Sequence, residues 1–292
     1  MVLEYLLSPQ EAERRPWELV LIAFVFVSLG VLTQLLIPAL QGSVIIFALI
    51  PSIPLFYLVL MSDEAHEERY SKMKREIEEW KRVLRAMKDD ELKRLPRFAL
   101  GHRIKRVYGV HRSLIQLFAF YFIGAVLAYT FWFAVLPSES SYELFYPQLQ
   151  EIRTLSSSIL TTQGFSEDAF NYLFNHNLQV FALMFLFSVL YGIGALYLLL
   201  WNASIIGVVV GERILNQGVM GVITGFLGLI PHGFFELFSY FIVALAGGIL
   251  SVSLARNSYK KPFFKYLVED IALLTLAALV FLAIGAVIEA SY

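Results

Sequence analysis

The feature that most constrains this chain is a series of long, uninterrupted apolar runs. A helix needs roughly 20 apolar residues to cross a hydrocarbon core about 30 Å thick, and several segments reach or approach that length. We therefore predict an all-α protein, a polytopic transmembrane helical bundle with about six to seven spans. The candidate spans are Trp17–Ile37, Ser43–Met61, Leu114–Leu136, Leu178–Trp201, a segment within 203–230, Phe234–Leu254 and Ile271–Ile288.

Composition supports a membrane protein and excludes other classes. The 292 residues are 58% hydrophobic and 16% charged, whereas soluble domains are about 45–50% apolar and about 25% charged. An ordinary water-soluble globular protein is therefore excluded. The chain has no cysteine, which excludes disulfides, cysteine nucleophiles and cysteine-ligated metals.

Lysine and arginine are distributed unevenly between the segments that join the apolar runs. Segment 62–112 carries fifteen of the 23 basic residues, whereas 137–177 carries only Arg153 against five acidic residues. Basic loops stay in the cytoplasm, so we expect a multi-pass plasma-membrane protein with 62–112 cytoplasmic and 137–177 outside. The same rule favours a single crossing for 203–230. Whether that segment is re-entrant or one broken span stays open.

These patterns divide the chain into three parts. Residues 1–61 are expected to form an N-terminal transmembrane hairpin, and 62–112 a basic cytoplasmic helical insert. Residues 113–292 are expected to form a transmembrane core, with 137–177 as its outside loop. That loop mixes aromatic and serine residues, and it is either a packed cap over the bundle or a docking surface.

The insert begins with apolar residues spaced three and four apart, which is the pattern of one helix face. We predict an amphipathic helix that lies on the membrane or on the inner face of the protein, with a partner-binding helix as the alternative. The residues that form this stripe are Tyr70, Met73, Ile77, Trp80, Leu84 and Met87.

A basic cluster follows the stripe and contains no acidic residue. Such a juxtamembrane cluster attracts anionic headgroups by about 1 kcal/mol per charge, so we expect contact with anionic membrane lipids. Nucleic acid is not an expected partner, because no interleaved aromatic platform accompanies the charges. The cluster consists of Lys93, Arg94, Arg97, Arg103, Lys105, Arg106 and Arg112.

Glycine is concentrated in the second half of the chain. Eleven of the 18 glycines fall between Gly192 and Gly248. Helices in lipid associate through close backbone approach at small residues, so we predict a tightly packed C-terminal bundle. Whether the same faces also form a homo-oligomer stays open.

The most informative polar run lies between two apolar segments, where Pro231, His232, Gly233 and Glu236 occur in the order PHGFFE. Proline suits the first turn of a helix, so a helix is expected to begin at Pro231. His232 and Glu236 are then four residues apart and share one face. Ionisable groups within spans are functional candidates.

This run resembles the PHG-x-x-E-L motif of the stage II sporulation protein M family of integral membrane proteins. The likeness extends over about 114–292, and residues 1–112 fall outside it. Ala203 and Ala290 stand where the family usually has glycine. The residues that match the family pattern are Asn175, Asn177, Asn202, Gly207, Pro231, His232, Gly233, Glu236, Gly247 and Gly248.

The predicted topology brings four polar residues to one membrane face. We hypothesise that His176, His232, Glu236 and Glu289 form a polar cluster near the outer leaflet. One alternative is that Glu236 answers the positive N-terminus of its helix while His232 bonds the turn over 230–233. Another is a metal or catalytic site at the same four residues, since histidine and carboxylate ligands suit zinc.

The resemblance implies a non-enzymatic membrane scaffold, because the sporulation protein is similar to a component that works with cell-wall hydrolases during engulfment. Other membrane or envelope proteins are then the expected partners, and no cofactor is expected. A transporter component is the alternative, because a stretch containing Glu212, Arg213, Asn216 and Gln217 interrupts an apolar segment. An intramembrane metal-dependent hydrolase is the second alternative, with zinc as its metal. No catalytic motif supports an enzyme directly.

Overall fold

The structure is a computed structural model of the chain. It describes residues 15–37, 39, 44–61, 75, 78–79, 82, 95–159, 166–192, 194–255, 257–260 and 264–291. Of 59–61, 95–114, 155–159, 229–230, 232, 258 and 266 it describes the backbone alone. Within these residues the chain is helical throughout, and six helices are long and apolar enough to cross a membrane. The predicted all-α membrane bundle is confirmed.

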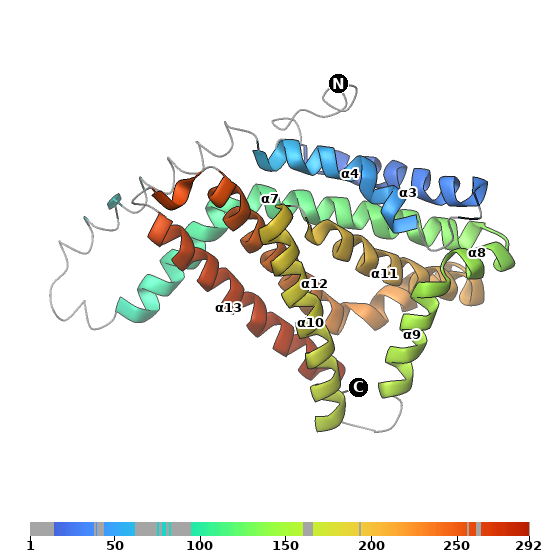
Figure 1. Ribbon diagram of the computed structural model, residues 1–292. Helices are drawn as coiled ribbons and strands as arrows, with labels where there is room; N and C mark the ends of the chain where they lie inside the picture. Colours follow the sequence, from blue (N-terminus) through green and yellow to red (C-terminus); the bar gives the residue numbers. More distant parts are fainter. Residues whose placement is uncertain are drawn as a thin grey trace.

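The helices form successive layers (Figure 1). At one side lie α3 (Glu18–Leu36) and α4 (Val44–Met61), which pack on each other, and α3 also packs on α7 (Leu95–Val135). α4 is a single helix that contains Pro51 and Pro54. A hydrogen bond between Ser52 and Tyr121 ties α4 to α7.

α3 shows why a continuously apolar helix is stable in this position. One face is buried against α4 and α7, whereas the other carries large exposed apolar side chains. An apolar face of this kind is stable when lipid, not water, surrounds it. The exposed residues are Leu21, Val25, Leu29 and Leu32.

The next layers hold the core. α7 packs on α11 (Ala195–Gln217), which packs on α12 (Val219–Ala255), and α12 contacts both α10 (Glu167–Tyr191) and α13 (Phe264–Glu289). A short 3-10 helix, η2 (Ser258–Lys260), precedes α13. The start of α10 lies beside the end of α13, because the Ser166 N–H donates to the Ala290 carbonyl at 3.1 Å.

One predicted span is wrong. The run Leu178–Trp201 is divided between α10 and α11, because Gly192 has a φ of 71° and ends α10. A left-handed residue is a common helix end and favours glycine. Apolar residues stand on both sides of this turn, so the hydropathy pattern does not reveal it.

The interrupted segment 203–230 is divided between two helices. α11 runs unbroken to Gln217, so Glu212 and Arg213 belong to its last turns, and Gly218 forms the turn into α12. Pro231 does not begin a helix either, since it lies inside α12. A membrane helix tolerates an internal proline when neighbouring groups satisfy the carbonyl that loses its donor.

The connection after α7 contains two helices, α8 (Ser138–Leu144) and α9 (Tyr146–Ile159). Leu144, Phe145 and Leu149 are buried against the bundle. Gln148 of α9 donates from Nε2 to Oγ of Ser204 in α11 at 3.1 Å, in a buried position. These two helices are therefore packed elements, as one of the two alternatives for this segment expected.

Most of the insert lies outside the described residues, including all six residues of the predicted stripe, together with Lys93 and Arg94 of the basic cluster. The other members of that cluster fall on the backbone of α7, and their side chains lie outside the description. These members are Arg97, Arg103, Lys105, Arg106 and Arg112. Lipid contact and the cytoplasmic position of the insert stay predictions.

Candidate functional site

A cavity of about 420 Å³ lies among six helices of the core. Its walls come from α7, α9, α10, α11, α12 and α13. The volume falls within the range of about 300–1,000 Å³ that is usual for ligand sites. The polar residues of its lining are Glu151, His176, Asn177, Asn202, Glu236, Tyr240 and Glu289.

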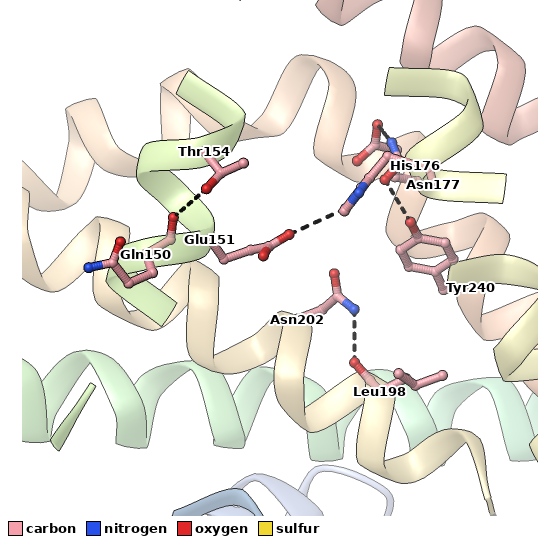
Figure 2. Close-up of polar contacts among 9 residues, drawn as sticks. Gln150, Glu151, Thr154, His176, Asn177, Leu198, Asn202 and Tyr240 are labelled. Atoms are coloured by element: carbon pink, nitrogen blue, oxygen red, sulfur yellow. Dashed lines mark hydrogen bonds and ion pairs between the residues drawn. The ribbon is translucent and has the colours of Figure 1, made fainter. Parts of the chain in front are cut away.

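Asn177 of α10 joins two polar side chains of α12. The Tyr240 hydroxyl donates to Oδ1 of Asn177 at 3.0 Å, and Nδ2 of Asn177 donates to Oε1 of Glu236 at 2.6 Å. Asn177 and Tyr240 are buried, and Figure 2 shows these two side chains pointing toward one another. Because each end of the amide is engaged, Asn177 holds the Glu236 carboxyl group in a fixed position.

Glu236 also forms a hydrogen bond with Glu289, the last residue of α13. An ionised carboxylate only accepts hydrogen bonds, so a hydrogen bond between two carboxyl groups needs a proton on one of them. The chain of contacts therefore runs from Tyr240 through Asn177 and Glu236 to Glu289. We call these four residues the buried relay; it links α10, α12 and α13.

A second polar contact crosses the cavity between α9 and α10. Nε2 of His176 lies 3.6 Å from Oε1 of Glu151, and each side chain is about one-third exposed, at 33% and 32%. Figure 2 shows the two side chains extending toward each other. The ring of His176 also stacks on that of Tyr172, with centroids 6.4 Å apart.

Asn202 of α11 presents an acceptor to the same space. Its Nδ2 donates to the Leu198 carbonyl of its own helix at 2.8 Å. This bond orients the amide so that its oxygen points toward the space between Glu151 and His176 (Figure 2). The side chain therefore offers the cavity an oxygen.

The remaining lining is apolar, mostly aliphatic, and it includes four aromatic residues. Phe122 of α7, Trp201 of α11 and Phe226 and Phe234 of α12 all contribute to it. Gly233 also lines the cavity, and a Cβ atom at this position would meet nothing within 4 Å. The cavity is thus amphiphilic, because polar side chains from five helices share its lining with aliphatic and aromatic ones.

The structure brings together three of the four residues of the hypothesised cluster. His176, Glu236 and Glu289 line the one cavity, whereas the side chain of His232 lies outside the described residues. The alternative role for Glu236 at a helix N-terminus is wrong, because α12 begins at Val219, far ahead of Glu236. That the cluster lies near the outer leaflet stays a prediction.

The family-pattern residues divide between cavity and packing. Asn177, Asn202, Gly233 and Glu236 line the cavity, while Asn175 is exposed.

The other family glycines permit close contacts between helices. A Cβ atom at Gly207 would lie 2.5 Å from Cβ of Tyr129, and one at Gly247 would lie 2.5 Å from Cβ of Ser188. A Cβ atom at Gly248 would lie 3.0 Å from the Gly192 carbonyl oxygen. These glycines therefore maintain helix packing, as the clustering of glycine predicts.

Glu151 and Tyr240 belong to the site although neither is among the candidates predicted from the sequence. Tyr240 follows Glu236 by four residues, which places both on one helix face, so that spacing is a usable signal. Glu151 has no such signal, because its position depends on how α9 packs against the bundle.

Within the described residues, no group of three or more histidine, aspartate or glutamate side chains has an arrangement that could hold a metal ion. The side chain of His232 is not among those residues.

Comparison with known proteins identifies the core. Residues 113–292, more than half of the chain, match the family described as Stage II sporulation protein M. The chain belongs to the stage II sporulation protein M family. The resemblance seen in the sequence is confirmed, and every residue of the cavity lining falls within the matched region.

A curated relative is also similar to part of the chain. The chain is 28% identical to "Uncharacterized protein MJ0793" of Methanocaldococcus jannaschii over 117 residues. The match covers 39% of this chain and 65% of the relative, slightly less than two thirds of its length. No solved structure matches the chain.

Proposed function

We propose that this stage II sporulation protein M family member is a non-enzymatic membrane scaffold, and that its partner protein engages the cavity. The observation that carries the proposal is the buried relay, which fixes the polar wall by contacts among Tyr240, Asn177 and Glu236. A wall whose side chains are held by their neighbours is preorganised for recognition, and preorganisation lowers the entropic cost of binding. The family resemblance supports a partner among membrane or envelope proteins.

The test is site-specific photo-crosslinking of the full chain in its own cells. A photoreactive residue replaces Leu127 or Ile152, which line the cavity, and a matched control replaces Leu21, which is exposed on α3. The proposal expects a protein adduct of one defined mass from the two cavity positions and none from the control. Equal labelling at Leu21, or no adduct from any position, would contradict it.

The scaffold is proposed to lie in the plasma membrane with α8 outside. Because the chain has no cysteine, single cysteines report orientation without background. A membrane-impermeant maleimide is expected to label Ser138→Cys in intact cells, and Asn257→Cys only after lysis. The reverse pattern would invert the orientation.

A transporter component is a second candidate, favoured by the depth of the cavity. Phe122 and Leu127, which line it, lie in the middle of the candidate span Ile115–Val135. The polar stretch around Glu212 and Arg213 does not support this candidate, since α11 is continuous through it. Saturable solute flux into liposomes that contain the purified protein, abolished by Asn177→Leu, would establish transport in place of scaffolding.

A further inference from the structure

Acidic residues outnumber basic ones in the cavity lining. The lining contains three carboxyl groups, on Glu151, Glu236 and Glu289, and one imidazole, on His176. Among the described residues of the lining there is no lysine or arginine. A low-dielectric space with this composition is more favourable for a cationic group than for an anionic one.

The hydrogen-bonding pattern points in the same direction. Two amide side chains of the lining donate hydrogen bonds within the protein. Asn177 donates to Glu236, and Asn202 donates to the Leu198 carbonyl. The Tyr240 hydroxyl likewise donates to Asn177. What faces the space is therefore rich in acceptors: the Asn202 oxygen and the carboxyl oxygens (Figure 2).

The apolar part of the lining suits the stem of an organic cation. Phe122, Trp201, Phe226 and Phe234 offer apolar surface and ring faces, and aromatic faces attract ammonium and guanidinium groups. A metal ion would gain nothing from this part of the lining, whereas an alkyl chain would be buried against it.

The volume limits what can enter. A volume of about 420 Å³ falls within the range that small-molecule sites usually have. It therefore suits a single long side chain or a small organic molecule.

From these observations we propose that the cavity binds an organic cation on an apolar stem, an alkylammonium or guanidinium group, which contacts Glu151, Asn202 and the Glu236–Glu289 pair. This inference rests on the proposed scaffold function in one respect: the partner would supply the group as a lysine or arginine side chain. A free alkyl amine carries the same chemistry.

The test uses the purified full chain in detergent with n-hexylammonium as the probe and hexan-1-ol as its neutral control. A ligand that binds the folded state raises the melting temperature. We expect n-hexylammonium to raise it with a dissociation constant at least tenfold lower than that of hexan-1-ol. Equal effects of the two compounds would overturn the proposal.

Three variants locate the binding. Glu236→Gln is expected to weaken n-hexylammonium binding at least tenfold. Glu151→Gln, at a partly exposed position where folding is less at risk, is expected to weaken it about threefold, and the exposed control Asn175→Ala leaves it unchanged. Unaltered binding in both glutamate variants would overturn the proposal, and if Glu236→Gln does not fold, unaltered binding in Glu151→Gln alone would do so.

The crosslink from Ile152 then distinguishes the two sources of the cation. If n-hexylammonium competes with the protein adduct, the group comes from the partner; if it binds without competing, a free amine is the ligand. If no adduct forms even without n-hexylammonium while ammonium binding is retained, the scaffold function alone is refuted. An adduct without ammonium binding refutes only the inference about charge.

Discussion

Two regions of the core, one closed and one open, differ in what stands opposite a glycine. In the closed region α11 touches α7 at Gly207, and a Cβ atom there would meet Cβ of Tyr129 at 2.5 Å and the backbone nitrogen of Thr130 at 3.0 Å. In the open region Gly233 of α12 lines the cavity, and a Cβ atom there would meet nothing within 4 Å. Glycine serves close packing in the first region, whereas Gly233 borders open space in the second. A family glycine therefore does not have one meaning.

The largest expected effect is at the closed region. Gly207→Leu places a branched side chain where Tyr129 and the α7 backbone already stand, so the helices must separate. Overpacking typically costs about 1–3 kcal/mol and occasionally more, and we expect about 3 kcal/mol for this variant. Thermal unfolding of the detergent-solubilised protein measures it. An unchanged melting temperature would show that this contact is not tight.

The buried relay is expected to come second. Asn177→Leu removes the amide that contacts both groups. The Tyr240 hydroxyl and Oε1 of Glu236 then each lose a hydrogen-bond partner. A buried polar group that loses its partner costs about 1–3 kcal/mol, so we expect a loss of about 2 kcal/mol. Asn175→Leu, at an exposed neighbouring position, is the control. Equal losses in the two variants would argue against the relay.

A smaller effect is expected where α9 attaches to the bundle. Gln148→Ala removes the buried hydrogen bond to Ser204, and interhelical hydrogen bonds in membrane proteins average about 0.6 kcal/mol. We expect a loss of about 1 kcal/mol, because side-chain contacts are removed as well. Gln150→Ala on the same helix serves as the control in the same unfolding assay. A loss above that of Asn177→Leu would mean that α9 is anchored more strongly than the buried relay.

The smallest effect is expected at the open region. In Gly233→Ala the added methyl group meets nothing within 4 Å, and alanine favours a helix over glycine by up to about 1 kcal/mol. We expect the melting temperature to stay the same or to rise slightly. Marked destabilisation would mean that the space beside Gly233 is closed in the folded protein.

The sequence predicts the helices better than their ends. Runs of about 20 apolar residues identify spans because the bilayer sets that length. The turn at Gly192 escapes detection because apolar residues flank it, and only its φ of 71° distinguishes it. The prediction for Pro231 is wrong for the related reason that a proline suits either a helix start or a tolerated interior position in a membrane.

The site is predictable where it depends on topology. His176, Glu236 and Glu289 form one predicted group because alternating spans bring their ends to one face, and all three line the cavity. Asn177 is recognisable as part of a pattern, but its contacts with Glu236 and Tyr240 depend on how α10 packs on α12. No periodicity in a single sequence specifies that packing.

The proline inside α12 has a structural consequence. Pro231 has no N–H, so the carbonyl of Leu227 one turn earlier lacks its helical donor. Before the proline, α12 packs along α11 through Gly221 and Gly225; after it, the helix packs on α10. Phe226 precedes this point and Glu236 follows it, and both line the cavity. Pro231 therefore stands where α12 passes from one packing partner to the next, between two residues of the site.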